Sequence, residues 1–261
     1  MSVDRILLTN DDGIEAVGLH ALHEALADDY EVTTVAPAED RSSVGRSLSS
    51  EVDVHAHDLG YAVDGTPSDC VVAGLGTLAP DADVVVAGCN EGANLGEYTL
   101  GRSGTVSAAV EATFFGVPAI AASMYVPGGD DWWKRDLDHE EFAHAARATR
   151  FLVDRAVDAG TFDAVDYVNL NAPIADGDPA PIRLTRPSTW HELDAERTAD
   201  GVTFHDGIWD RMFEGNVPDP VGTDRRAILD GEVSVSPLSA THAVATDELL
   251  ERLVDEYVAT S

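Results

Sequence analysis

Short apolar runs rich in Val, Ile and Leu alternate along the chain with longer segments whose apolar residues recur at helical spacing. This alternation is typical of βαβ units, in which helices connect parallel strands and cover the sheet. Strands are predicted at Arg5–Leu8, Glu31–Ala36, Tyr61–Val63, Asp83–Ala87, Ala119–Ser123, Tyr167–Leu170 and Glu232–Val235. The pattern therefore predicts an α/β fold with a mostly parallel sheet, in which the uninterrupted apolar run DVVVA is a buried central strand.

Helices are predicted between these strands. An apolar stripe follows the first strand at Leu19, Leu22, Ala25 and Leu26. Thr66 can cap a helix that has Pro67 at its first position and runs to about Leu78, since proline is favoured there. Further helices are expected over Thr105–Phe115, from Phe142 to about Ala159, and over Asp247–Val258.

The pattern weakens between residues 174 and 231, where Pro, Asp and Gly are frequent and strand-like pieces such as Ile182–Thr185 are short. We interpret this stretch as an extended hairpin arm, because its large aromatic residues need to be buried. These are Trp190, Phe204, Trp209 and Phe213. The predicted division is a core over residues 1–173, the arm over 174–231, and a strand and helix over 232–261 that return to a core.

Charge narrows the classes of partner. The 261 residues include 48 acidic and 16 basic side chains, for a formal net charge of -32. Duplex nucleic acid and anionic membranes attract clustered Lys and Arg, so neither is expected as a partner. A hydrophobic fraction of 44% is that of a folded globular protein. Acidic residues spread along the whole chain resemble the surfaces of proteins from extreme halophiles.

The sequence also bears on location. No basic N-terminal region precedes an apolar run, and no apolar stretch approaches the length of about 18 residues that a membrane helix needs. Cys70 and Cys89 lie inside apolar stretches, which favours buried reduced thiols. We therefore expect a cytoplasmic protein.

Three polar groups follow predicted strands, at the edge of a parallel sheet where ligands bind. The first, Thr9–Gly13, contains the adjacent carboxylates Asp11 and Asp12. Two carboxylates that repel each other can both stay ionised by binding a hard cation such as Mg²⁺ or Mn²⁺. The alternative is a plain Asn-Asp-Asp-Gly turn, because these residues favour turns.

The other two groups suggest anion binding. Residues 37–50 combine Arg41 and Arg46 with several serines and a glycine, which fits either anion contact or a solvated loop. Residues 88–96 contain three glycines and are predicted to form a loop. Beyond them, Ser103, Gly104 and Thr105 open a helix whose free N–H groups can bind phosphate, although a simple N-cap by Ser103 gives the same pattern.

Other reaction schemes lack their residues. The chain has no GxGxxG after the first strand, no GxxxxGK[ST] loop, no GxSxG elbow and no HExxH pair. Gly13 stands where an aspartyl-phosphate enzyme needs a second Asp. His55 and His57 alternate on a predicted strand and are more typical of surface residues than of metal ligands.

Seven segments together resemble the SurE family, the survival-protein nucleotidases. They are LLTNDDGI (7–14), AP with RSS (36–37 and 41–43), GTPSDCV (65–71), AGCNEGANLG (87–96), SGTVSAA (103–109), VNLNAP (168–173) and GTDRRAILDGEVSVSPL (222–238), in family order over nearly the whole chain. The resemblance implies a Rossmann-like three-layer core with a C-terminal swapped hairpin arm that builds dimers or tetramers. It also implies a phosphomonoesterase that uses one divalent cation, Mg²⁺ or Mn²⁺, on nucleoside 5'-monophosphates and also on 3'-monophosphates.

The resemblance places the metal ligands at Asp11, Asp12, Ser42 and Asn90. It places phosphate-binding residues at Asn94, Ser103, Gly104 and Thr105, to which we add Arg46 from its loop. Asp11, Asp12 and Asn90 are the candidate catalytic residues, with Asp12 as the candidate acceptor of the water proton. Arg102 and Ser43 differ from the family pattern and can change the nucleoside preference. The alternative function is a nucleotide-binding sensor without turnover, which a phosphate-release assay would distinguish.

Overall fold

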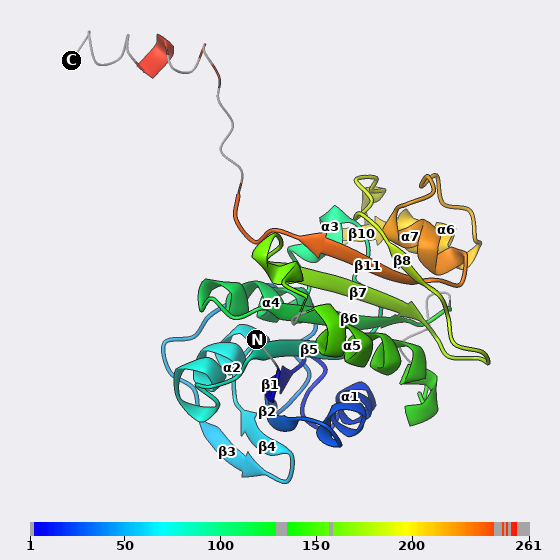
Figure 1. Cartoon of the computed structure of the whole chain (residues 1–261). Coiled ribbons are helices and arrows are strands. Elements are labelled where there is room, and N and C mark those ends of the chain that lie inside the picture. The colour runs from blue at the N-terminus through cyan, green and yellow to red at the C-terminus, as the bar shows by residue number, and fades with distance from the viewer. Residues whose placement is uncertain are drawn as a thin grey trace.

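The computed structural model describes residues 3–128, 135–156 and 159–242, together with residues 247, 249 and 252–254. One nine-stranded sheet runs through the molecule in the order β3-β4-β2-β1-β5-β6-β7-β11-β8 (Figure 1). Its strands are β1 (Arg5–Thr9), β2 (Glu31–Pro37), β3 (Val54–His57), β4 (Gly60–Val63), β5 (Val84–Glu91), β6 (Ala119–Tyr125), β7 (Tyr167–Pro173), β8 (Ile182–Leu184) and β11 (Val233–Leu238). The strands from β4 to β7 are parallel, whereas β3 and β11 run antiparallel to β4 and β7. The predicted α/β fold is confirmed.

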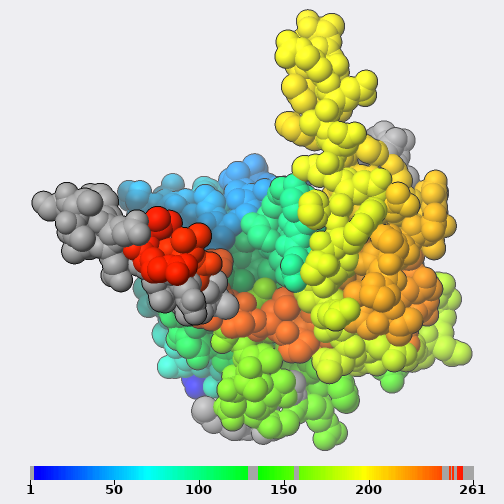
Figure 2. All heavy atoms as spheres, turned by 90° about the horizontal axis from the view of Figure 1, so that it is seen from above, coloured from blue at the N-terminus to red at the C-terminus, as the bar shows by residue number. Residues whose placement is uncertain are grey.

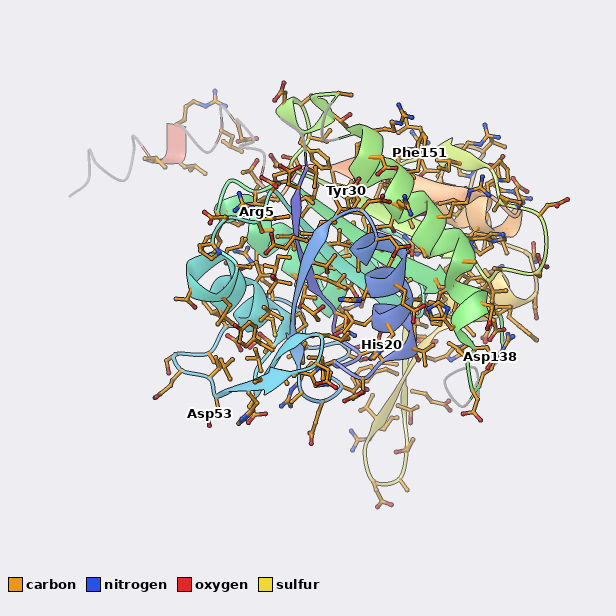
Figure 3. All side chains as sticks on the ribbon, turned by 60° about the horizontal axis from the view of Figure 1, so that its bottom comes forward. Arg5, His20, Tyr30, Asp53, Asp138 and Phe151 are labelled. Atoms are coloured by element: carbon orange, nitrogen blue, oxygen red, sulfur yellow. The ribbon has the colours of Figure 1, made fainter. Side chains whose placement is uncertain are left out.

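Helices cover both faces of the sheet, which gives three layers. On one face α1 (Val17–Ala27) packs beside α5 (Ala143–Ala156), and Figure 3 looks onto this pair, with His20 on α1 and Phe151 on α5. On the other face lie α2 (Pro67–Ala73) and α4 (Gly104–Phe114). Because side chains alternate along a strand, β5 sends Val84 and Val86 into one apolar layer and Val85 into the other.

The start of α2 matches its predicted cap. The Thr66 hydroxyl accepts a hydrogen bond from the backbone N–H of Asp69 at 3.1 Å, and the Asp69 carboxylate accepts one from the N–H of Thr66 at 2.8 Å. Pro67 occupies the first turn, as expected. The helix then continues as a π-helical turn over Gly74–Leu78, so the predicted end is also met.

Beyond β7, part of the chain adds strands to the sheet and part of it forms separate elements. Strands β8 and β11 extend the sheet, whereas β9 (Leu193–Arg197) and β10 (Val202–Asp206) form a separate antiparallel hairpin. Figure 2 shows this hairpin, in yellow, projecting from the body of the molecule. Two further helices are α6 (Gly207–Phe213) and α7 (Asp224–Leu229).

The aromatic residues of this segment are not all buried within one chain. Phe204 and Phe213 are 72% and 59% exposed. The prediction that they are buried is therefore not met within a single chain: Phe204 lies on β10, which among the described residues pairs only with β9, and Phe213 is the last residue of α6.

Three remaining expectations concern the thiols, the membrane and the C-terminus. Cys70 and Cys89 are buried and free, as predicted, and burial raises the pKa of both thiols. In the part of the chain that the structure describes, no helix is long and apolar enough to span a bilayer. The helix predicted over residues 247–258 lies largely outside the described residues.

Candidate active site

The predicted polar groups meet at the carboxyl ends of β1, β2 and β5, which lie side by side or one strand apart in the sheet. A cleft of about 350 Å³ opens there. Asp11, Ser42, Asn90, Asn94 and Ser103 all line it. The structure thus brings together five of the nine residues that the sequence singled out. Of the others, Gly104 and Thr105 contact Asp11, and Asp12 is next to it in the chain.

Asp11 is the buried centre of this arrangement, with 3% of its surface exposed. Its carboxylate accepts hydrogen bonds from both the hydroxyl and the backbone N–H of Thr105. Its backbone oxygen accepts from the N–H of Arg41 at 2.7 Å, which fixes the loop after β2 against the loop after β1. Burial outweighs the hydrogen bonds and raises the pKa of Asp11 to about 6.

Asp12 follows Asp11 in the chain but is not among the residues that line the cleft. Its Oδ2 atom accepts a hydrogen bond from the backbone N–H of Glu91 at 3.0 Å, so the carboxylate is tied to the end of β5. Burial, and then the neighbouring charge of Asp11, raise the pKa of Asp12 well above its usual range. Two such carboxylates are costly to ionise together unless a cation neutralises them.

The first turn of α4 uses most of its polar groups within the protein, on the helix cap and on Asp11. The Ser103 hydroxyl caps the helix by accepting from the N–H of Val106 at 3.0 Å, and Thr105 donates to Asp11. The expectation of several free N–H groups is therefore wrong, because among the described residues only Gly104 in the cap and first turn lacks an assigned acceptor for its N–H. The Ser103 O–H proton remains available for a ligand, since a hydroxyl can accept and donate at once.

The loop that the glycines predicted over residues 88–96 is shorter in the structure, because only residues 92–96 leave the strand. Strand β5 continues to Glu91, and Asn90 and Glu91 pair with Ser123 and Met124 of β6 after a shift in register. Gly88 allows this continuation, since a Cβ atom there would lie 2.1 Å from the backbone oxygen of Ala122. The Asn90 amide group donates to the backbone oxygen of Gly92, which leaves its Oδ1 atom as an acceptor at the cleft.

Asn94 is held by the neighbouring strands. Its backbone N–H donates to Asn171 Oδ1 at 2.8 Å, and its side-chain amide donates to Ser123 Oγ at 3.0 Å. The backbone oxygen of Asn94 accepts from the amides of Asn169 and Asn171 at 3.0 Å and 3.1 Å. This network fixes Asn94 in the wall of the cleft.

One buried carboxylate links the loop that follows Asn94 to the segment beyond β8. Asp224 accepts hydrogen bonds from the N–H groups of Gly96 at 2.7 Å and Ser188 at 3.0 Å. The neighbouring Arg225 is 1% exposed and donates to the backbone oxygen of Trp190 at 2.7 Å. Asp224 and Arg225 therefore connect the core wall of the cleft to the segment that contributes its opposite wall.

The loop after β2 contributes Ser42 but not Arg46. Ser42 donates through its N–H and its hydroxyl to Asp40 Oδ1, at 2.7 Å and 2.6 Å. The Arg46 guanidinium donates instead to Glu111 at 2.9 Å and lies 4.5 Å from the ring centroid of Phe114. Arg46 is therefore directed at the side of α4, and it is not among the residues that line the cleft.

Several lining residues had no site signal in the sequence. Glu91 lies at the end of β5, where its carboxylate accepts from the N–H groups that open α1, yet burial still raises its pKa. Tyr125 ends β6, and Asp206 and Trp209 come from the segment after the hairpin. Arg102 was noted only as a departure from a pattern. Nothing in periodicity or spacing indicates that these residues converge.

The donor atoms at this cleft fit a hard divalent cation. The described residues contain no cluster of three or more His, Cys, Asp and Glu side chains that could hold a metal. Asp11, Asp12, Asn90 and Ser42 instead offer carboxylate, amide and hydroxyl oxygens, which are the ligands that Mg²⁺ and Mn²⁺ prefer. The raised pKa values of both carboxyls agree with a site completed by positive charge.

Comparison with known proteins gives a consistent result. The family model of the survival protein SurE matches residues 6–194. A "5'-nucleotidase SurE" from Natronomonas pharaonis is 60% identical over 254 residues, covering 97% of this chain and 99% of the relative. A protein of the same name from Haloarcula marismortui is 58% identical, covering 98% and 96%. The crystal structure of the SurE protein from Aquifex aeolicus superposes with a TM-score of 0.76 at 30% identity, covering 97% of this chain and 99% of that chain.

Proposed function

The chain belongs to the SurE family, and from this premise we propose that it is a 5'-nucleotidase that hydrolyses nucleoside 5'-monophosphates, and also 3'-monophosphates, to nucleoside and phosphate. The observation that carries the proposal is the buried Asp11, hydrogen-bonded to Thr105 at the start of α4, in a cleft that Ser42, Asn90, Asn94 and Ser103 also line, with Asp12 next to it in the chain. Relatives that match nearly the full length of the chain have the name of this activity.

In this proposal Asp11, Asp12, Asn90 and Ser42 hold one divalent cation. When bound, Mg²⁺ or Mn²⁺ would neutralise phosphate charge and make water a better nucleophile. Thr105 keeps Asp11 oriented through its hydroxyl and N–H, and the backbone of Glu91 does the same for Asp12. A carboxylate fixed in this way can serve as a ligand without reorganising when substrate arrives.

The other residues bind the phosphate group. The Ser103 O–H and the Gly104 N–H can donate to phosphate oxygens, near the positive end of the α4 dipole. Asn94 is a further polar contact, held by Asn171 and Ser123. The attacking water forms a bond to phosphorus as the bond to the nucleoside oxygen breaks; Asp12 is the group that we assign to accept the water proton, and the departing oxygen takes its proton from solvent.

Oligomerisation through the C-terminal arm is part of the proposal. The β9–β10 hairpin projects from the body with Phe204 and Leu193 exposed, at 72% and 47%. Exposed apolar side chains on an unpaired hairpin gain stability by packing against another copy. A homodimer or homotetramer would cover them.

The test is phosphate release from AMP in molar salt, with Mn²⁺ or Mg²⁺ and with a chelator. We expect turnover with a cation, loss of turnover on chelation, and recovery when the cation is restored. A protein that binds AMP but releases no phosphate with any divalent cation would instead be a nucleotide sensor. Parallel assays with 3'-monophosphates test the second substrate class.

A further inference from the structure

The cleft is larger than the reaction requires. A phosphate group fills on the order of 100 Å³, scaling from the ~30 Å³ that one water occupies in the liquid. The cleft holds about 350 Å³, a volume in the range of sites for whole small molecules. Its lining residues differ in role, because Asp11, Asn90 and Ser103 are assigned to the metal and the phosphate, whereas Arg102, Asp206 and Trp209 line the same cleft and have no part in that chemistry.

Trp209 is a fixed aromatic surface in that wall. It packs against a small apolar cluster formed by Leu95, Met212 and Ile228, which are 0%, 2% and 4% exposed. The indole is therefore anchored on one side, while it also lines the cleft. A large, rigid aromatic group of this kind binds a planar ligand at a low cost in conformational entropy.

Arg102 is the second planar group. Its guanidinium carbon lies 3.7 Å from the centroid of the Tyr98 ring, and its Nη2 atom donates to the Tyr98 hydroxyl. Tyr98 in turn stacks on His191, with centroids 5.3 Å apart and planes 12° from parallel. These contacts hold the guanidinium by an aromatic ring rather than by an acid, since no carboxylate of the described residues lies within 4.0 Å of it.

The positive charge of Arg102 also distinguishes it from the other residues that line the cleft. It is the one basic residue lining the cleft in the described part of the chain, next to the acidic Asp11, Glu91 and Asp206. A guanidinium stacks on nucleobases and also donates to their edge atoms. An ammonium ion would provide the charge without the planar face.

We propose that Arg102 and Trp209 form the nucleobase subsite, in which the base binds against the guanidinium and the indole while the phosphate lies at Asp11 and Ser103. The inference rests on the proposed nucleotidase function and adds the residues that select the base. The two groups come from different parts of the chain, so the base is bound between the loop before α4 and helix α6.

The experiment compares AMP with ribose 5-phosphate, which has the same phosphate ester and no base. For W209A we expect kcat/KM on AMP to fall about tenfold or more, and for R102K about fivefold. Both losses should appear mostly in KM, as expected from loss of base stacking. Turnover of ribose 5-phosphate should change less than about twofold, which also shows that the variants fold. F213A, on the same helix and 59% exposed, is the matched control and should leave both substrates unchanged.

The opposite results are equally clear. A loss that is the same for both substrates, or no loss with AMP, would overturn the subsite. W209L, which keeps apolar packing against Leu95 without the indole, repeats the test if W209A is unstable. Failure of the nucleotidase proposal differs, because the wild type would then release phosphate from neither substrate. Calorimetric binding of AMP and ribose 5-phosphate to W209A and wild type would still measure the contribution of the base.

Discussion

Gly104 packs directly on Asp11. A Cβ atom at Gly104 would lie 2.7 Å from the Asp11 Cβ atom and 2.8 Å from its Oδ2 atom. Helix α4 can therefore begin at the carboxylate only because its first residue has no side chain. This contact places the proposed metal ligand directly against the first residue of the proposed phosphate-binding turn.

G104A should displace Asp11, because 2.7 Å is far shorter than a normal carbon–carbon contact. We expect kcat/KM on AMP to fall by at least about tenfold and the affinity for Mn²⁺ to weaken. G76A is the control, because a Cβ atom there meets nothing within 4 Å. Steady-state kinetics and Mn²⁺ titration check the prediction, and a G104A protein with wild-type values for both would contradict it.

D11N and D12N should each lower turnover of AMP by at least about 100-fold, because each removes an anionic ligand. D53N makes the same change in charge at an exposed position, marked in Figure 3, and should be neutral. Turnover is measured at saturating Mn²⁺ and Mg²⁺. Near wild-type turnover by D11N or D12N would exclude this metal site.

The pH dependence of stability follows from Asp11. Burial raises its pKa to about 6 from 3.8, so between these values the folded, metal-free protein binds a proton that the unfolded chain has lost. Stability falls with rising pH where the folded state binds more protons, so this carboxyl makes the free energy of unfolding decrease from about pH 4 to about pH 6.

The measurement is the melting temperature of chelator-treated protein in molar salt at about pH 5 and about pH 7. D11N, which has no such proton to lose, should show a smaller decrease over this interval than the wild type. Equal decreases in the two proteins would mean that Asp11 titrates with its ordinary pKa. Adding Mn²⁺ at the higher pH should raise the melting temperature of the wild-type protein again, since the cation supplies the positive charge that was lost with the proton.

D224A should destabilise the fold and loosen the cleft. Asp224 is fully buried and accepts from the backbone N–H groups of Gly96, Ser188 and Arg225, so its loss leaves three N–H groups without their acceptor and removes a negative charge close to the buried Arg225. We expect a loss of at least about 2 kcal/mol in the free energy of unfolding and a raised KM for AMP. D230A removes an exposed acid six residues along the chain and is the control. An unchanged denaturation midpoint for D224A would show that the link between the walls is dispensable.

Salt dependence follows from the net charge of -32. The Debye length is about 30 Å at 0.01 M salt and about 3 Å at 1 M, so repulsion across the whole molecule is screened only in concentrated salt. We expect melting temperature and activity to rise together from dilute to molar KCl. Sedimentation should show that oligomers dissociate first on dilution of the salt, because association brings two acidic chains together. If stability, activity and mass were all independent of salt, the acidic surface would not be a salt adaptation.

The sequence predicted what depends on periodicity and on the ends of strands. It located β1, β2 and β5 and the polar residues that follow them, since the hydrophobic pattern marks each strand and the point where it ends. It did not predict that β5 runs on to Glu91, because Gly88 and Asn90 favour turns and only pairing with β6 overrides that preference. It also assigned the first N–H groups of α4 to phosphate, whereas packing aims those of Thr105 at Asp11. Contacts of this kind form between segments that are distant in the sequence, so the local pattern of residues cannot predict them.

The origin of the two cleft walls in the chain has an evolutionary consequence. Every residue assigned to phosphate chemistry precedes β6, whereas Trp209 and Asp206 follow β8 and are linked to the rest through Asp224 and Arg225. Insertions or substitutions between residues 186 and 223 can therefore alter which nucleoside is accepted while the reacting atoms keep their positions. Lineages that share the same hydrolytic machinery can diverge in substrate range by remodelling this stretch, and grafting it between relatives would transfer the Trp209 half of the base subsite, whereas Arg102 stays with the loop before α4.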